Sequence, residues 1–556
     1  MSAARDFPGG IHTDDHKAFS AEAAIVQAPL SRRYIVPLRQ HIGEPAEVTV
    51  RPGERVLRGQ LIGAALGDVS AAVHAPTSGF VSAIEARPIP HPSGLSDLCV
   101  VIEADGEDAA APEAALDWTR LDGASLRRHV RDLGLVGLGG AVFPSHIKLA
   151  PPPGRALDTL ILNGVECEPW ITCDDRLMRE RGSEILRGGA IMQRLLGCQR
   201  LLVGIEDNKP ATLAAMRAAA ASPEFAGHAI EIRAVATRYP AGGGKQLTQL
   251  LTGRVTPTGG LTTDVGVQVF NVGTAYSLYR GFHTGEPLIR RIVTVTGQVA
   301  RPGNFEVRIG TPLADLIACA GGDLADCGGH LIGGPMMGFD VDDLAVPVVK
   351  SVNCLIAKPP ALFPARPPAL PCIRCGACAR ACPAELQPFE LYWYARARDF
   401  GKTQAYHLFD CIECGCCSFV CPSHIPLVDY YRFAKSEIWA REKEKDASDA
   451  ARERHEFHLF RLEREKREKA EKLGKKASDR LDAGAVAGED AEAARKRAIL
   501  EAAIARAQQA RVETQPKNTD NLTPEQQREV AEIDARRAQL AAPAPEKPAH
   551  DTEPAA

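Results

Sequence analysis

The chain has 556 residues, of which 45% are hydrophobic and 24% charged, with a formal net charge of -4. This length exceeds what one hydrophobic core usually holds, so several folded units are expected. The nearly balanced charge, with no basic stripe carrying interleaved aromatic residues, argues against nucleic acid as a partner.

Targeting and membrane signals are also missing from the sequence. Residues 1–20 lack the pattern of a secretory signal, and no apolar run reaches the roughly 18 residues that a membrane span needs. The best candidate, AIMQRLLGCQRLLVGI, is interrupted by Arg194 and Arg200 and predicts a helix followed by a buried strand. A cytoplasmic location is therefore expected, where clustered cysteines bind metal more often than they form disulfides.

The N-terminal part, residues 1–115, is predicted to be a small β unit. Within residues 33–85, short apolar runs alternate with turn residues, as in VTVRPGERVLRGQLIGAA. The segment VHAPTSGFV resembles a turn of the lipoyl and biotinyl barrel-sandwich fold. Because GDVSAAVHAP holds no lysine, a structural module is predicted rather than a carrier of a swinging arm.

Residues 116–285 are predicted to form an α/β unit, because apolar strand candidates such as TLILNG and LLVGIE alternate with helical stretches. In GLVGLGGAVFPSHIKL, a glycine-rich turn precedes a predicted helix. Backbone N–H groups of Gly137, Gly139 and Gly140 can approach a phosphate, and Lys148 can balance its charge. An ordinary structural turn uses the same residues, so this alternative stays open.

Further polar residues come near the ends of the predicted strands. They are Asn163, Glu166 and Glu168 in LILNGVECEP, Lys245 in YPAGGGKQL, and Asn271 and Thr274 in QVFNVGTAYSL. Open α/β sheets bind ligands at the carboxyl ends of their strands. Each residue alone also fits a turn or a helix cap.

Residues 286–358 predict a compact α+β unit of two strands, a Pro-Gly turn and a short helix. A proline-rich linker follows at residues 359–371, where PPALFPARPPALP favours an extended chain.

Eight cysteines after this linker form a doubled motif within a unit predicted at residues 359–440. The spacing C-x2-C-x2-C-x3-C-P occurs twice, which is the pattern of two-cluster ferredoxins rather than of zinc knuckles or disulfides. In such pairs the fourth cysteine of each run binds the other cluster. The predicted ligands are Cys372, Cys375, Cys378 and Cys421 for the first [4Fe-4S] cluster, and Cys411, Cys414, Cys417 and Cys382 for the second.

Cysteines outside these ligand sets are predicted to be packing residues. Cys416 is expected to pack near a cluster, and Cys99, Cys198 and Cys319 to be buried. The last segment, residues 441–556, is rich in Glu, Lys, Arg and Ala. It predicts a long solvated helix with i,i+4 charge pairs and a disordered end.

Taken in order, these segments resemble two related families. The glycine loop is similar to the FMN loop of the NADH-binding flavoprotein subunit of respiratory complex I. The resemblance to the C subunit of the Rnf electron-transport complex is closer and reaches to about residue 440. It is carried by GGIHTDDHK, YIVPLRQHIGEPAE, HAPTSG, NGVECEP, GGPMMG, CIRCGACARACP and CIECGCCSFVCP, and VTVTGQVARPGNF resembles the soluble-ligand-binding β-grasp (SLBB) unit of both families.

The resemblance implies a multidomain α/β and α+β protein. Its units would be a barrel-sandwich β module, a Rossmann-like FMN/NADH domain, an SLBB-like β-grasp unit, a helical ferredoxin-type domain with two [4Fe-4S] clusters, and the charged tail. The implied function is a peripheral, translocase-type oxidoreductase subunit at the cytoplasmic face of the bacterial inner membrane. It would exchange electrons between NADH and ferredoxin while partner subunits, among them a ferredoxin-type iron–sulfur subunit, transport ions.

The resemblance also assigns roles to residues. Gly137, Gly139, Gly140, Lys148, Asn163, Asn271 and Thr274 match FMN-site positions, and Glu166 and Glu168 match acids near FMN and nicotinamide. The chain departs from the complex I pattern at Leu138, Val165 and GGGK, which stand where complex I has arginine, aspartate and paired glutamates. Lys245 is the candidate to replace one lost contact. No catalytic side chain is expected, because the hydride passes between cofactors.

Two other functions remain open from the sequence. One is a free soluble NADH-dependent flavin and iron–sulfur oxidoreductase, and the other is a cluster-bearing adaptor without flavin.

Overall fold

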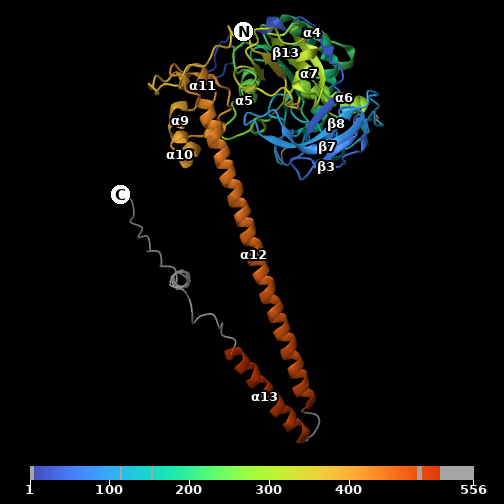
Figure 1. Ribbon diagram of the computed structural model, residues 1–556, viewed down its shortest axis with the longest axis vertical. Coiled ribbons are helices and arrows are strands. Elements are labelled where there is room, and N and C mark those ends of the chain that lie inside the picture. The colour runs from blue at the N-terminus through green and yellow to red at the C-terminus, as the bar shows by residue number, and fades with distance from the viewer. Residues whose placement is uncertain (1–5, 113–114, 152–153, 485–490, 514–556) are drawn as a thin grey trace. The chain divides into compact units, whose positions relative to one another are not determined.

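The computed structural model describes residues 6–112, 115–151, 154–484 and 491–513 (Figure 1). A compact body extends as far as Glu444. No helix among the described residues combines the length and the apolar character that crossing a membrane requires. The predicted disorder of the C-terminal end falls on residues 514–556, which lie outside the described residues.

Two small antiparallel sheets form the N-terminal β module. The first has the order β2 (Arg33–Pro37), β8 (Ser96–Ala104), β7 (Gly79–Pro88) and β4 (Arg55–Val56), and the second has β3 (Glu47–Val48), β5 (Leu61–Ala64) and β6 (Val73–His74). Side chains such as Tyr34, Ile62 and Ile102 are fully buried in one core shared by both sheets. This arrangement agrees with the predicted all-β unit.

A parallel four-stranded sheet organises the α/β unit. Its strand order is β11 (Ile230–Val235), β10 (Arg200–Glu206), β9 (Thr159–Asn163) and β12 (Val267–Asn271). Its helices are α1 (Gly123–Asp132), α2 (Ser145–Lys148), α3 (Cys173–Leu196), α4 (Pro210–Ala220), α5 (Gly244–Thr252) and α6 (Val272–Thr284). The predicted helix and buried strand around Arg194 and Arg200 are α3 and β10.

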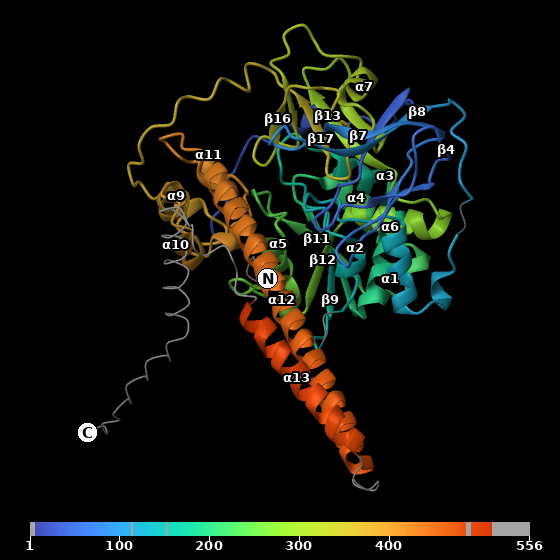
Figure 2. The same ribbon diagram turned by 60° about the horizontal axis from the view of Figure 1, so that its bottom comes forward.

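Both faces of this sheet are covered, which explains why its strands are apolar almost throughout. Leu160, Leu162 and Phe270 belong to a core that also contains side chains of α1, α3 and α6, while Ile161 and Val269 pack with residues of α5. In Figure 2, β9, β11 and β12 run side by side with α5 near one end of the sheet. The loops at the carboxyl ends of the strands are therefore left to form a site.

The β-grasp unit contains a six-stranded sheet. Its order is β1 (Val26–Gln27), β14 (Gly303–Arg308), β13 (Arg290–Gly297), β17 (Cys354–Ala357), β15 (His330–Ile332) and β16 (Phe339–Val341), with α7 (Leu313–Cys319) beside it. Strand β1 comes from the segment predicted to belong to the N-terminal unit. It pairs with β14 through Val26 and Phe305, so the residues before β2 extend other units rather than the β module.

Short helices carry the doubled cysteine motif. They are α8 (Ala377–Ala381), α9 (Pro388–Arg396), α10 (Phe400–Ala405) and α11 (Cys416–Phe419). Helix α12 (Leu427–Gly484) begins in this unit and continues through the predicted boundary at residue 440, and α13 (Ala491–Glu513) follows. Exposed pairs such as Arg464 with Glu468 lie along α12 at i,i+4 spacing, as predicted for a solvated helix. Single-turn helices occur at Lys17–Phe19, Trp118–Arg120, Pro223–Phe225, Thr262–Val265 and Leu408–Asp410.

A buried lysine joins three of these units. The Lys350 ammonium, in a side chain only 1% exposed, donates hydrogen bonds to the carbonyl oxygens of Ala72 in the β module and Gly134 in the α/β unit, at 3.0 and 2.7 Å. His41 is buried at the same junction and contacts the Ala71 carbonyl oxygen through Nε2. Polar contacts at such a junction fix how the units meet, because each buried group needs its partner.

We expect this junction to make the protein sensitive to acid. Burial, followed by the charge of Lys350, lowers the pKa of His41 from 6.5 to about 4. Between these values the unfolded chain binds a proton that the native chain does not, so stability is present above pH 6.5 and is lost as the pH falls towards 4. The loss at pH 4 is about 3 kcal/mol.

Thermal unfolding measured from pH 7 to pH 4 checks this expectation. His41→Gln should flatten the dependence of the unfolding temperature on pH, whereas His91→Gln, at an exposed position, should leave it unchanged. Equal slopes for the two variants would contradict the assignment to His41.

Candidate functional site

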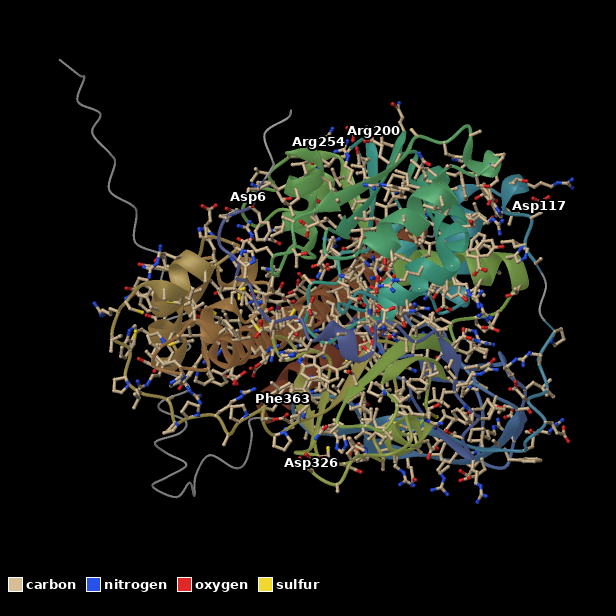
Figure 3. The ribbon with its side chains drawn as sticks, turned by 90° about the horizontal axis from the view of Figure 1, so that it is seen from above. Asp6, Asp117, Arg200, Arg254, Asp326 and Phe363 are labelled. Atoms are coloured by element: carbon tan, nitrogen blue, oxygen red, sulfur yellow. The ribbon has the colours of Figure 1, made fainter. Side chains whose placement is uncertain are left out.

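Two cavities in the helical unit are lined by the predicted cluster ligands. A cavity of about 350 Å³ is bordered by Cys372, Cys375, Cys378 and Cys421, and one of about 360 Å³ by Cys382, Cys411, Cys414 and Cys417. Each cavity thus takes three cysteines from one motif and the fourth from the other. Figure 3 shows sulfur atoms gathered among the ribbons of this unit. The donor set of each cavity, four thiols and no competing carboxylate, fits a [4Fe-4S] cluster.

The backbone repeats the same conformation in both motifs. Arg374 and Glu413 have φ angles of 55° and 57°, and the glycines two residues later, Gly376 and Gly415, have 73° and 81°. In this left-handed conformation the N–H of Arg374 points to Cys372 Sγ at 3.5 Å, and that of Glu413 to Cys411 Sγ at 3.4 Å. Hydrogen bonds to the sulfur atoms are one of the factors that set the potential of a cluster.

The two cavities differ in exposure. The first lies at the surface, because Cys375 is exposed and Ile373 beside it is 68% exposed. In the second cavity, Cys414 and Cys417 are buried. Cys416 is fully buried among Ile11, Tyr239 and Ala381, as expected of a packing residue. The second cavity therefore faces the rest of the body.

Loops of the α/β unit hold this second cavity from outside the helical unit. The Tyr239 hydroxyl donates to the Cys414 carbonyl oxygen at 2.7 Å, and Gln246 Nε2 donates to the Pro383 carbonyl oxygen at 3.1 Å. Lys245 forms an ion pair of 2.9 Å with Asp410, the residue before Cys411. The structure thus places Lys245 at the joint between the two units rather than with the other predicted nucleotide contacts.

An N-terminal segment, Phe7–Lys17, crosses the same joint. Gly10 N–H donates to the Ala381 carbonyl oxygen at 3.0 Å, and Ile11 pairs with Tyr239 through both backbone groups. Further along, the buried Lys17 ammonium donates to the Glu168 carbonyl oxygen at 3.0 Å. No local pattern in the sequence predicted this role, and the only signal for the segment was the family resemblance of GGIHTDDHK.

Two asparagines mark the predicted ligand-binding edge of the sheet. Asn163 and Asn271 are the last residues of β9 and β12 and lie opposite each other in register. Asn163 Nδ2 donates to the Gly242 carbonyl oxygen at 2.8 Å, and Asn271 Oδ1 accepts from Gly273 N–H at 2.8 Å, which caps α6. The strand ends and the GGGK loop are therefore brought together, as the sequence predicted.

The glycine loop lies against this edge. Thr274 Oγ1 accepts a hydrogen bond from the Leu138 N–H at 2.9 Å. A side chain at Gly139 would begin 3.1 Å from the Asn271 Cβ atom, while Gly140 has a φ of 111° and no heavy atom lies within 4 Å of the place that a Cβ atom would take there. This open, glycine-lined surface next to amide side chains fits the close approach of a phosphate-bearing cofactor such as FMN.

Lys148 lies at the end of the short helix α2 after this loop. Its ammonium donates to the Val269 carbonyl oxygen at 2.6 Å and lies over the ring of Phe270. Burial lowers the pKa of Lys148 to about 8. The amine is thus held against strand β12 near the predicted site.

The two predicted acids serve different neighbours. Glu166 accepts a hydrogen bond from the Asp174 N–H at 2.8 Å, in the first turn of α3, and burial raises its pKa to about 7. Glu168 accepts from the backbone N–H groups of Met336 and Met337, at 2.8 and 3.1 Å, in a loop of the β-grasp unit. Glu168 therefore links the α/β and β-grasp units beside the joint.

The cysteines outside the cavities fulfil the expectation of burial only in part. Cys99 and Cys198 are buried, but Cys319, at the end of α7, is half-buried. An apolar neighbourhood in the sequence does not distinguish a core position from the rim of a short helix.

We expect Thr274→Val to loosen the glycine loop. The substitution keeps the side-chain shape but leaves the buried Leu138 N–H without an acceptor, which costs about 1–3 kcal/mol. FMN content after reconstitution and the thermal unfolding temperature should both fall. Thr284→Val, which removes an exposed hydroxyl at the other end of α6, should change neither, and equal effects of the two variants would contradict this account.

Four family models match successive parts of the chain. They are an RnfC barrel sandwich hybrid domain at residues 5–107, a Nuo51 FMN-binding domain at 130–280, an SLBB domain at 292–340 and a 4Fe-4S dicluster domain at 371–425. These matches confirm the predicted barrel-sandwich, FMN-binding, SLBB and ferredoxin-type units. They also confirm FMN and two [4Fe-4S] clusters as the cofactors.

Curated relatives share a single description, the C subunit of an ion-translocating oxidoreductase complex. The protein from Pseudomonas aeruginosa is 46% identical over 412 residues, which cover 74% of this chain and 53% of the relative. The one from Citrobacter koseri is 45% identical over 448 residues, covering 80% and 63%. The chain thus spans little more than half the length of these relatives.

Among solved structures, the chain is similar to a chain of an NAD+-reducing [NiFe]-hydrogenase. In the H2-reduced state the TM-score is 0.41 at 17% identity, with 72% of this chain and 83% of that chain covered. In the air-oxidized state the TM-score is 0.39, with 68% and 77% covered.

Proposed function

Because the chain is a homologue of the C subunit of ion-translocating oxidoreductase complexes, we propose that it is the electron-input subunit of such a complex. In this function it exchanges electrons between NADH and ferredoxin through FMN and two [4Fe-4S] clusters, while partner subunits couple the transfer to ion transport. The chain acts as a peripheral subunit at the cytoplasmic face of the bacterial inner membrane.

The observation that carries this proposal is the joint between the flavin-site loops and the second cysteine cavity. Tyr239, in the loop whose Gly242 carbonyl oxygen binds Asn163, donates directly to the Cys414 carbonyl oxygen. One short loop thus contacts a strand end of the candidate flavin site and a cluster-ligand segment. A flavin-free adaptor has no need for this contact.

The cofactors divide the chemistry in a way that the chain's residues can support. FMN, when bound, accepts a hydride and passes its electrons on singly, which [4Fe-4S] clusters require. The residues proposed to hold FMN are Gly137, Gly139, Gly140, Lys148, Asn163, Asn271 and Thr274, with Glu166 and Glu168 beside them. The loop glycines approach the cofactor, the two asparagines orient it, and the burial of their neighbours excludes water.

The ligands proposed for the clusters are the two crossed sets. Cys372, Cys375, Cys378 and Cys421 hold the outer cluster, and Cys382, Cys411, Cys414 and Cys417 hold the inner one. The lining of the two cavities supports this division. The burial of the second cavity against the flavin loops supports the order flavin, inner cluster, outer cluster.

The surface around the outer cavity suits a redox partner. Exposed Ile373 and Phe419 lie in the two motifs with the exposed cations Arg374 and Arg380. Apolar residues with basic neighbours favour a small acidic partner, and we propose a ferredoxin-type iron–sulfur subunit of the complex in this role.

Anaerobic purification of the full chain after cofactor reconstitution tests the function. About eight irons per chain and one FMN that NADH bleaches are expected, followed by reduction of the clusters. Clusters that stay oxidised when NADH has reduced the flavin would contradict the proposal. Retention of the chain by washed membranes of cells that make the partner subunits separates a complex subunit from a free enzyme.

A further inference from the structure

A second group of metal-binding side chains lies in the β-grasp unit, outside both cysteine cavities. Asp323, Cys327 and His330 each direct one donor atom to a common point, and these atoms lie within 4.8 Å of one another. Asp326, in the same loop, is labelled at the edge of the molecule in Figure 3. None of the three residues takes part in the proposed electron transfer.

The distances fit a tetrahedral zinc site. His330 Nε2 is 2.9 Å from Asp323 Oδ2 and 3.9 Å from Cys327 Sγ. With zinc bonds to sulfur and nitrogen near 2.3 and 2.1 Å, donors in a tetrahedron are about 3.3–3.6 Å apart. Shifts of a few tenths of an ångström would bring both pairs to this separation.

The same geometry is unsuitable for nucleophilic catalysis. In a Cys-His-Asp relay the nucleophile and the carboxylate bind opposite nitrogens of the imidazole ring. Here both approach Nε2. A single cation between the three side chains accounts for this convergence, whereas a proton relay does not.

The charges and the backbone also favour a divalent cation. A thiolate and a carboxylate together balance two positive charges, and the neighbouring Lys358 is already paired with Asp340 at 2.9 Å. His330 begins β15 and is paired on both sides, with Val341 and Ala357. Donors on a rigid strand keep their position, which a metal site requires.

We propose that Asp323, Cys327 and His330 bind one zinc-class divalent cation, with water in the fourth position. The mixed sulfur, nitrogen and oxygen donors favour zinc over magnesium or calcium, which prefer oxygen alone. The loop also binds the start of the proline-rich linker, since Gly328 N–H donates to the Lys358 carbonyl oxygen and Lys358 N–H to that of Gly329, at 2.9 and 2.8 Å. The cation therefore fastens the root of the linker that leads to the cluster unit.

Zinc binding to the full-length holoprotein tests this site. After incubation with zinc and desalting, about one zinc per chain is expected, together with unchanged iron and FMN contents. X-ray absorption at the zinc edge should show one sulfur and otherwise nitrogen or oxygen neighbours. Zinc that had entered vacant cluster sites would instead show four sulfurs, so the spectrum separates the two cases.

Variants complete the test. Cys327→Ser and His330→Gln should each reduce bound zinc to background while iron and FMN are retained. Cys319→Ser, at a half-buried cysteine of the same unit, should still bind one zinc. The proposal is wrong if the wild-type protein retains no zinc, if its zinc has a four-sulfur shell, or if both site variants retain as much zinc as Cys319→Ser. These outcomes do not depend on NADH oxidation and leave the proposed function untouched.

Discussion

In a Cys382→Ala variant, NADH is expected to reduce the flavin but not the one remaining cluster. Cys382 belongs to the first motif, yet it lines the inner cavity with Cys411, Cys414 and Cys417. Alanine offers no ligand atom, so the inner cluster is lost and the iron content falls from about eight to about four per chain. The outer cluster keeps its four cysteines but has lost its connection to the flavin.

Cys421→Ala is the matched control, because it removes the fourth cysteine of the other motif. Its thiol lines the outer cavity, so the same amount of iron should be lost while the inner cluster remains beside the flavin loops. NADH should still reduce that cluster within the time in which the wild-type protein reacts. Electron paramagnetic resonance after rapid freezing distinguishes the two variants.

Ligation within each motif would reverse these results. Cys382→Ala would then retain a cluster beside the flavin loops that NADH reduces, and Cys421→Ala would retain only the outer one. The pair of variants therefore tests the crossed ligand sets and the order of the clusters at once.

Cluster cavities and strand ends were predictable because both depend on short spacings in the sequence. The C-x2-C-x2-C-x3-C-P pattern dictates a local loop and helix, and the same left-handed residues recur in both runs. Likewise, an asparagine directly after an apolar strand must lie at the edge of a parallel sheet, which is where Asn163 and Asn271 meet.

Contacts between units were not predictable in the same way. Tyr239 reaches Cys414 across 175 residues of sequence and Lys17 reaches Glu168 across 151. Strand β1 pairs with β14 although it precedes the β module. Neither a hydrophobic period nor a motif encodes such pairs, because they depend on how finished units pack together. For the same reason the sequence offered Lys245 as a nucleotide contact, while its ammonium pairs with Asp410.

Gly415→Ala is expected to slow electron transfer from flavin to the inner cluster without removing either cofactor. A Cβ atom at Gly415 would lie 2.6 Å from the Met336 carbonyl oxygen, and Met336 belongs to the β-grasp loop that binds Glu168. The cysteine loop must therefore move away from the flavin side of the joint. Since a displacement of 1 Å in a reacting geometry can cost about 10²-fold in rate, stopped-flow reduction by NADH should show a large decrease.

Gly376→Ala separates this effect from backbone strain. Gly376 occupies the equivalent position of the first motif with a similar positive φ, so both alanines carry the same left-handed penalty of roughly 1–2 kcal/mol. The added Cβ atom at Gly376 meets only the flexible end of Arg380, at 3.3 Å. Gly376→Ala should therefore keep the wild-type rate of inner-cluster reduction, with iron and FMN contents equal in both variants. If the two variants slow the reaction equally, strain within the cysteine loops governs the rate, and contact between the inner cluster loop and the β-grasp unit does not.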